Sequence, residues 1–147
     1  MHYADITAAD TMLLAAAIAA AERLYHPNIQ EVAAALRTSD GQLFSAIHFE
    51  TATGFATICG EVAAICCMVA AGRRDLDTIV AVWRAPDGAC YLLPPCGRCR
   101  EVIADFNPEA WVIVSRAPDH WDQAAIKQPA RVRIAELLPL KSHLLKG

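Results

Sequence analysis

Two long apolar stretches of the chain have the pattern expected of helices. Residues 7–25 are rich in alanine and contain neither glycine nor proline, which predicts a helix with Thr7 or Asp10 as its cap. Residues 57–72 are apolar on nearly every side of a helix and end in Gly72, a common stop signal. Because a helix that is apolar all round is usually buried, we expect this second helix to lie inside the protein.

Shorter runs of β-branched and apolar residues predict strands. Residues 32–38 and 42–48 flank Asp40-Gly41, and Asp-Gly between two such runs is a strong hairpin signal. Residues 76–84 and 111–115 predict further buried strands. Because helices and strands follow one another along the chain, the pattern indicates an α/β protein.

The last third of the chain contains two shorter helical stretches. Pro94-Pro95 lead into a helix predicted over residues 96–106, which Asn107-Pro108 end. Residues 132–138 predict a short terminal helix. Residues 116–128 are polar and irregular, so they form either a lid or substrate-side loop or a solvated insertion.

Length and charge limit the classes of function. At 147 residues we expect one domain over residues 1–147. The formal net charge of −3, without a basic arm, argues against a nucleic-acid duplex or a membrane surface as the partner. The apolar run over residues 12–21 is too short to span a bilayer. The hydrophobic content of 55% is sufficient for a large core or a buried subunit surface.

Six cysteines lie along the chain in a pattern that does not indicate disulfides. Three fit a metal motif, Cys66 and Cys67 are expected to pack within an apolar helix, and Cys90 stands alone. Reduced cysteines of this kind are typical of cytosolic proteins. Because the first residues also lack the basic segment of a signal peptide, we expect a cytoplasmic protein.

The chemistry of the chain is concentrated in two short segments. Cys96 and Cys99 form a C-x-x-C clip after Pro95, and Cys59 supplies a third thiol. A catalytic zinc ion takes three protein ligands and keeps its fourth position for water. Glu61 is placed to face that water and to shuttle protons, rather than to bind the same metal. This C-x-E…P-C-x-x-C arrangement is the signature of zinc-dependent base deaminases.

Two other uses of the motif stay open. A clip alone can be a redox pair or part of a structural zinc site, but structural sites usually have four Cys or His ligands. The chain has no second clip and no H-x₃-H motif. A non-catalytic zinc-binding module would be insensitive to Glu61→Ala. A polynucleotide deaminase would bind single strands in a salt-sensitive way, which the acidic composition disfavours.

Several segments between residues 32 and 139 match one known family. They are VAAAL at 32–36, DGQLF at 40–44, FETA at 49–52, ICGE at 58–61, PCGRCREV at 95–102 and ELLP at 136–139. With these segments the chain resembles the cytidine deaminase family, including its blasticidin-S deaminase branch. The zinc motif is specific for the superfamily, and the flanking segments are typical of the small tetrameric nucleoside deaminases rather than of the polynucleotide editors.

The resemblance implies a fold, a reaction and an assembly. We expect a three-layer α/β/α fold with a mixed central sheet of about five strands, and the two zinc-binding helices side by side on one face. The implied reaction is the hydrolytic deamination of cytidine, deoxycytidine or a related cytosine nucleoside, with release of ammonia. Cys59, Cys96 and Cys99 would bind Zn²⁺, and Glu61 would shuttle the proton. Such enzymes usually assemble as homotetramers, so we expect a homotetramer.

The resemblance also assigns residues to the substrate. In the family, an Asn-x-Glu motif grips the ribose hydroxyls, and His48 and Glu50 occupy its positions here. Glu50 matches the motif and is expected to accept the hydroxyl protons. His48 replaces the Asn, so its contact with the sugar is altered. The backbone at Gly60 is expected to hold the ring.

Three departures from the family bear on the substrate. His48 replaces the Asn, and Gln30 and Ser142 fall where the family has aromatic residues. A pocket without these groups could hold something other than a plain ribonucleoside, and a blasticidin-S-type antibiotic is the alternative. The spacing from His48 to Cys59 and the presence of Glu50 favour the nucleoside enzymes.

The charge at the metal predicts a role for one arginine. Three thiolates on Zn²⁺ leave a net charge of −1, which weakens the ion as a Lewis acid. Family members with three cysteines compensate with positive charge, commonly an Arg directly after the catalytic Glu, where this chain has Val62. Arg98 inside the clip is the remaining candidate and is expected to hydrogen-bond a zinc thiolate. Two helix N-termini would add to its effect.

Overall fold

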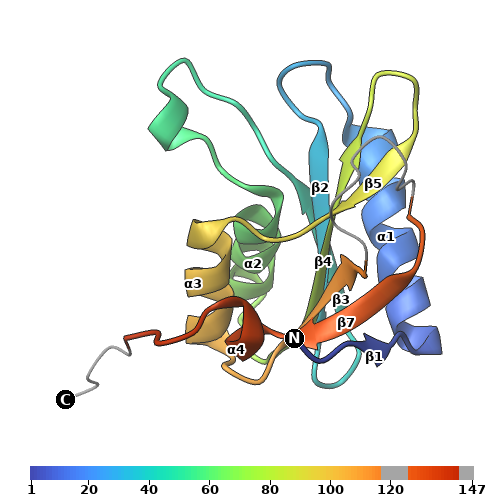
Figure 1. Ribbon diagram of the computed structural model, residues 1–147. Coiled ribbons are helices and arrows are strands. Elements are labelled where there is room, and N and C mark those ends of the chain that lie inside the picture. The colour runs from blue at the N-terminus through green and yellow to red at the C-terminus, as the bar shows by residue number, and fades with distance from the viewer. Residues whose placement is uncertain (117–125, 143–147) are drawn as a thin grey trace.

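The computed structural model describes residues 1–116 and 126–142. In chain order the elements are β1 (Ala4–Asp5), α1 (Ala8–Leu24), β2 (Val32–Thr38), β3 (Leu43–Ile47), η1 (Gly54–Ala56), α2 (Gly60–Ala70), β4 (Leu76–Arg84), β5 (Cys90–Leu93), α3 (Gly97–Phe106), β6 (Trp111–Ser115), β7 (Pro129–Arg133) and α4 (Ile134–Leu137). The sheet lies between α1 on one face and α2, α3 and α4 on the other (Figure 1). The predicted three-layer α/β/α fold is confirmed.

The sheet is mixed, as predicted. Its strand order is β1-β7-β6-β4-β2-β3, and β5 pairs with β4 beside this path. The pairing of β4 with β6 is parallel, whereas β4 pairs with β2 and β5 in the antiparallel sense. β4 lies in the middle of the sheet, and its buried residues pack against α2 and α3.

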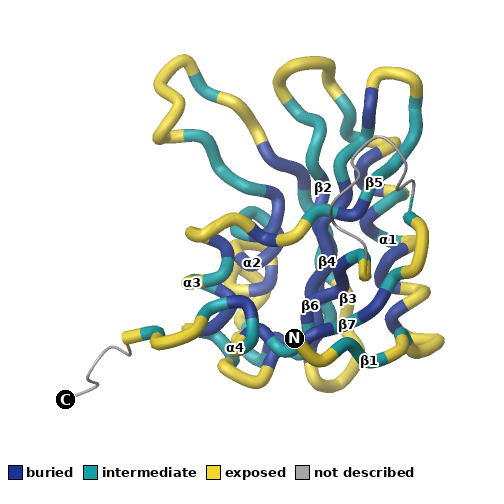
Figure 2. The backbone as a smooth tube through the Cα atoms, in the orientation of Figure 1, coloured by how far each residue is buried: buried dark blue, intermediate teal, exposed yellow. Residues whose placement is uncertain are grey.

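Alternate residues of the central strands face different layers. In β2, Ala33 and Ala35 pack with α1, whereas Ala34 and Leu36 pack with α2 and α3. The run of alanines is weak strand material by propensity, but β2 is paired on both edges and buried on both faces, so tertiary packing outweighs propensity. Figure 2 shows the buried residues concentrated along the central strands and on the sheet-facing sides of the helices.

Two local signals act as the sequence predicts. The β2–β3 hairpin turns at Asp40-Gly41, where Gly41 has a φ of 93°, a left-handed conformation that favours glycine. At the start of α1, Thr7 is the cap, and its Oγ1 accepts a hydrogen bond of 3.2 Å from the backbone N–H of Asp10. The Asp10 carboxylate accepts one of 2.9 Å from the Thr7 N–H, which completes a capping box.

The expected strand number is too low. Within residues 1–116 and 126–142 the sheet has seven strands rather than about five. β1 and β5 were not predicted, because they are short and are formed by pairing with β7 and β4 rather than by a local pattern. β7 takes up residues 129–133, so the predicted terminal helix over 132–138 begins only at Ile134. Most of the predicted 116–128 loop lies outside the described residues.

The buried helix is also shorter than predicted and is buried on one face only. α2 begins at Gly60 rather than at residue 57, because Ile58 pairs with Phe49 in an isolated antiparallel bridge. Ala64, Ile65 and Met68 are buried against the sheet. The opposite face is exposed although it is apolar, since a helix that lies on a sheet turns only one side towards it; the exposed residues are Cys66, Cys67, Val69 and Ala70.

Candidate active site

Two helix N-termini bring three thiols together. Cys59 directly precedes α2, Cys96 directly precedes α3, and Cys99 lies in the first turn of α3. The Sγ atoms of Cys59 and Cys96 are 3.5 Å apart, and those of Cys96 and Cys99 are also 3.5 Å apart. The convergence that the motif predicts is therefore present, although Cys59 is far from the clip in the sequence.

The three sulfurs fit a zinc ion. They lie within 4.8 Å of one another, and sulfurs bound at about 2.3 Å to tetrahedral zinc would be about 3.8 Å apart. Burial raises the pKa of Cys59 and of Cys99, and the charge of Glu61 adds to both shifts. At Cys96 burial is outweighed by hydrogen bonds, first from the backbone of Cys99, which lower the pKa. Ionising all three thiols together therefore requires a compensating cation.

The number of ligands indicates an open site. Among residues 1–116 and 126–142, no fourth Cys, His, Asp or Glu joins this cluster. Closed structural zinc sites have four protein ligands, whereas catalytic sites have three and leave one position for water. The donor set is therefore that of a catalytic site.

Glu61 lies in the first turn of α2 and is buried, with 6% of its surface exposed. Burial raises the pKa of its carboxyl group above the ordinary value of 4.5. Glu61 lines the same cavity as Cys59 and Cys96. A buried carboxyl group that lines a cavity beside a candidate metal site is well placed to accept and return a proton.

A cavity of about 250 Å³ opens over this group. Its size is close to the lower limit of small-molecule sites. Its walls combine apolar side chains with a few convergent polar groups; they are Val32, His48, Glu50, Thr57, Cys59, Gly60, Glu61, Leu93, Pro94 and Cys96. The structure thus brings the predicted residues Glu50, His48 and Gly60 to one cavity with the metal cluster.

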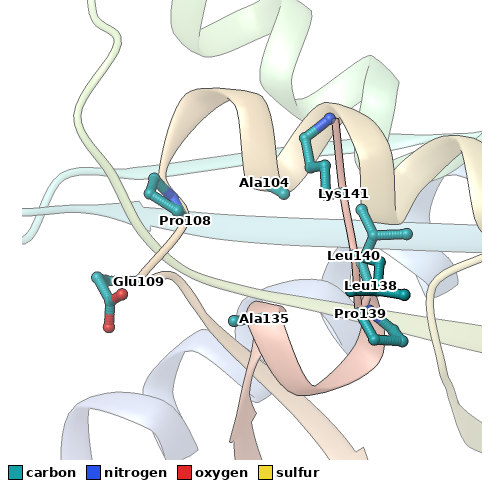
Figure 3. Close-up of a pocket in the computed structure, with 8 residues that line it drawn as sticks. All are labelled: Ala104, Pro108, Glu109, Ala135, Leu138, Pro139, Leu140 and Lys141. Carbon is teal, nitrogen blue, oxygen red and sulfur yellow. The ribbon is translucent and has the colours of Figure 1, made fainter. Parts of the chain in front are cut away.

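A second cavity of about 330 Å³ is larger but has no comparable chemistry. It lies between α3, α4 and the segment after α4; Figure 3 shows Leu138, Pro139 and Leu140 on one side and Pro108 and Glu109 on the other. Its lining contains no thiol, and Lys141 is held in ion pairs with carboxylates of α3. Chemistry rather than volume therefore identifies the first cavity as the candidate active site.

His48 and Glu50 contribute polar groups to the wall of the same cavity. His48 is buried, and its Nδ1 accepts hydrogen bonds from the backbone N–H groups of Glu31 at 3.1 Å and Val32 at 2.8 Å. Its Nε2 lies 3.5 Å from Oε1 of Glu50. Glu50 is half exposed, and its Oε2 accepts a hydrogen bond of 2.9 Å from Oγ1 of Thr57.

Gly60 is at a point of close backbone approach. A Cβ atom at this position would lie 2.7 Å from the carbonyl oxygen of Val32, so a side chain does not fit without moving the helix. Glycine therefore lets the N-terminus of α2, where Cys59 and Glu61 line the cavity, approach β2 closely.

Arg98 has partners other than those predicted. Its guanidinium donates hydrogen bonds to the carbonyl oxygens of Thr57 at 2.7 Å and Phe55 at 3.3 Å. These bonds connect the first turn of α3, which carries the cysteine clip, to the loop between β3 and α2. The charge still lies inside the clip, between Cys96 and Cys99 in the sequence.

The sequence interpretation missed some cavity residues. Thr57, Leu93 and Pro94 line the cavity, but no local pattern distinguishes them from ordinary loop and strand residues. The position of Thr57 beside Glu50 depends on the folding of the 49–58 loop, which only the three-dimensional structure shows.

The comparison with protein families identifies the group to which the chain belongs. The family described as "Cytidine and deoxycytidylate deaminase zinc-binding region" matches residues 7–115. The chain belongs to the cytidine deaminase family. Members of this family are zinc-dependent hydrolytic deaminases, and the three-cysteine cluster of this deaminase could hold the zinc ion.

Curated relatives cover most of the deaminase. It is 36% identical over 142 residues to a blasticidin-S deaminase from Bacillus cereus, with 93% of this chain and 94% of the relative covered. It is 37% identical over 100 residues to a cytidine deaminase from Halalkalibacterium halodurans, with 66% and 71% covered. Relatives with two different named substrates therefore have nearly the same sequence identity.

Solved structures confirm the fold assignment. The cytidine deaminase from Burkholderia pseudomallei has a TM-score of 0.72 and 28% identity, with 93% of this deaminase and 100% of that chain covered. That from Mycobacterium leprae has a TM-score of 0.69 and 28% identity, with 91% and 99% covered. Across the described parts of the chain, no helix combines the length and apolarity needed to cross a membrane.

Proposed function

We propose that this deaminase hydrolyses the exocyclic amine of a cytosine nucleoside, cytidine or deoxycytidine, and releases ammonia. The observation that carries the proposal is a single cavity lined both by the cysteine cluster and by an acceptor for hydroxyl groups. Cys59 and Cys96 of the cluster line it together with the buried Glu61 and with Glu50. A cavity with both kinds of group in its walls suits a substrate that consists of a base and a sugar.

Each residue has a distinct part in the reaction. Cys59, Cys96 and Cys99 would hold zinc, which would supply a water molecule of lowered pKa. Glu61 takes a proton from that water and gives it to the ring nitrogen. It then carries the second proton to the departing amine, so that a C–O bond forms, the C–N bond breaks and ammonia leaves. The backbone at Gly60 lies beside the ring.

The polar groups of the cavity favour an uncharged sugar. Glu50 accepts hydrogen bonds from the sugar hydroxyls, and His48 lies beside it. Among the described residues that line the cavity, none is a Lys or Arg, whereas two are glutamates. Because a phosphate group would have no cationic partner here, we expect nucleosides to be preferred over nucleotides.

A blasticidin-S-type antibiotic is the second candidate substrate. It is favoured by the relative from Bacillus cereus, whose similarity extends over 93% of this chain. His48 also supports it, because the residue departs from the Asn-x-Glu motif that the nucleoside enzymes have. The presence of Glu50 supports the nucleoside.

The deciding experiment compares substrates on one zinc-loaded preparation. Cytidine, deoxycytidine, deoxycytidylate, cytosine and blasticidin S are incubated separately, and the ultraviolet change and the released ammonia are followed. Glu61→Gln, which keeps the size of the side chain but removes its proton shuttle, is the control. We expect turnover of a nucleoside that falls at least about 10²-fold in the variant.

Other outcomes have definite meanings. Turnover of blasticidin S alone would replace the nucleoside with the antibiotic. If no substrate is turned over while zinc is bound, this would contradict the proposed deamination of cytosine nucleosides and favour a non-catalytic zinc-binding module. Salt-sensitive binding of single-stranded nucleic acid would indicate a polynucleotide deaminase instead.

We further propose that the deaminase forms homotetramers in the cytoplasm. The outer face of α2 is apolar and exposed in the single chain, so contact with another subunit would cover it. The thiol-rich metal site suits a reducing compartment. Light scattering on the purified protein tests the assembly, and a stable monomer would contradict it.

A further inference from the structure

His48 occupies a position at which the ring can no longer accept a hydrogen bond from a substrate. Its Nδ1 already accepts from two backbone N–H groups, those of Glu31 and Val32. An imidazole nitrogen that accepts hydrogen bonds carries no proton, so the proton of the neutral ring is on Nε2. His48 therefore presents a donor, and only a donor, to the cavity.

The donor of His48 faces a carboxylate. Nε2 lies 3.5 Å from Oε1 of Glu50, while the other oxygen of Glu50 accepts from the Thr57 hydroxyl. The distance is longer than an optimal hydrogen bond, as contacts in active sites often are until substrate tightens them. One oxygen of the half-exposed carboxylate is thus held by a hydrogen bond from Thr57, and the other lies beside the Nε2 of His48.

We propose that His48 is a positioning residue, which acts on the substrate through Glu50 rather than by contact with the sugar. The ring is locked as the Nε2–H tautomer by the backbone of β2 and the residue before it, and it turns the Glu50 carboxylate so that its free lone pairs face the cavity. This assignment rests on the proposed function, because it concerns the residue that binds the sugar hydroxyl. In this arrangement Glu50, and not His48, accepts the hydrogen bond from the sugar hydroxyl.

Two substitutions of His48 separate positioning from structural support. His48→Gln places an amide donor near the position of Nε2, whereas His48→Met has a similar length and shape but no donor. Both leave the N–H groups of Glu31 and Val32 without their acceptor, so any structural loss is shared. The melting temperature of each variant checks that the losses match.

The kinetic readout uses cytidine and 2′,3′-dideoxycytidine, which lacks the hydroxyls that Glu50 would bind. We expect His48→Met to raise KM for cytidine about tenfold with little change in kcat, and His48→Gln to stay within about threefold of the wild type. With dideoxycytidine the two variants should be alike. In a Glu50→Ala background the difference between Gln and Met should also vanish. Equal KM values for cytidine in both variants would overturn the proposal.

Two further measurements keep the test decisive. If the zinc-loaded wild type turns over neither cytidine nor deoxycytidine, the proposed function fails, and crystal structures of the two variants decide the positioning role. A Glu50 carboxylate displaced in His48→Met but not in His48→Gln supports the role, and the same position in both overturns it.

If neither variant folds, the ¹⁵N spectrum of the His48 ring in the wild type provides the answer. An Nε2–H tautomer whose Nε2 signal moves on Glu50→Gln supports the proposal, whereas an Nδ1–H tautomer, or an Nε2 signal that does not move, overturns it.

Discussion

The Arg98 guanidinium donates a hydrogen bond of 2.7 Å to the carbonyl oxygen of Thr57. Thr57 in turn donates a hydrogen bond from its hydroxyl group to Glu50. The cysteine clip of α3 is therefore connected through Arg98 and Thr57 to the Glu50 carboxylate in the wall of the cavity. A change at the clip should consequently be detectable at Glu50 as well as at the cysteine cluster.

Two substitutions of Arg98 distinguish its charge from its hydrogen bonds. Arg98→Lys keeps the charge but loses the paired hydrogen bonds to Phe55 and Thr57. We expect it to retain zinc and to raise KM about threefold. Arg98→Gln also loses the positive charge that the residue brings to the cysteine clip, so both zinc affinity and turnover should fall. Zinc titration and steady-state kinetics measure both; if Arg98→Gln leaves both unchanged, the residue has neither role.

Gly60 and Gly97 provide a matched pair, because each is the first residue of a helix and directly follows a cysteine of the candidate metal site. Gly60→Ala would place a Cβ atom 2.7 Å from a backbone oxygen, whereas nothing lies within 4 Å of the same atom at Gly97. We expect Gly60→Ala to lower the free energy of unfolding by about 2–3 kcal/mol and to reduce bound zinc. Gly97→Ala should change the free energy of unfolding by less than about 1 kcal/mol. Chemical denaturation and metal analysis provide the comparison, and similar losses at both positions would contradict the account of Gly60.

The three-thiol site predicts which cysteines hold the metal. Cys96→Ser should lower the zinc content of the purified protein well below that of the wild type. Cys67→Ser, at an exposed position on α2, should retain it. Because binding to the folded state alone adds to stability, a chelator should lower the melting temperature of the wild type and of Cys67→Ser. Equal zinc content in both variants would exclude Cys96 as a ligand.

Asp10 predicts how stability depends on pH. The carboxylate is fully buried and lies 3.0 Å from Arg37 and 3.4 Å from Arg131. Burial raises its pKa, but hydrogen bonds from Thr7 and Arg37 and the charge of Arg37 outweigh this, so the pKa lies below the ordinary value of 3.8. A carboxyl group with a lowered pKa in the folded state stabilises the protein above its unfolded pKa and loses this contribution as the pH falls through the folded value.

Asp10→Asn should therefore be destabilising at neutral pH, by about 2–4 kcal/mol. The difference from the wild type should shrink as the pH falls below about 4, near the pKa of an unfolded aspartate. Asp77→Asn removes the more exposed partner of Arg37 and should cost less than about 1 kcal/mol. Denaturation at several pH values measures both variants. If the difference in the free energy of unfolding between Asp10→Asn and the wild type grows as the pH falls, the pKa of Asp10 is not lowered in the folded protein.

Much of this protein follows from its sequence alone, where the physical cause is local. The Asp40-Gly41 turn, the Thr7 cap and the C-x-x-C clip each depend on a few neighbouring residues, and the structure contains the first two as predicted. The convergence of Cys59 with the clip also followed, because zinc chemistry requires three ligands at bonding distance.

Only the tertiary structure shows the strands and side-chain contacts that depend on backbone groups far away in the sequence. β5 and β7 exist because β4 and β6 offer them hydrogen-bonding edges, and no local pattern predicted them. His48 is held as a donor by N–H groups 16 and 17 residues away, and Arg98 reaches carbonyl groups 41 and 43 residues away. Side-chain identity names the groups that a chain can offer. The neighbouring backbone in the folded protein decides which lone pairs and protons of these groups stay free for a substrate.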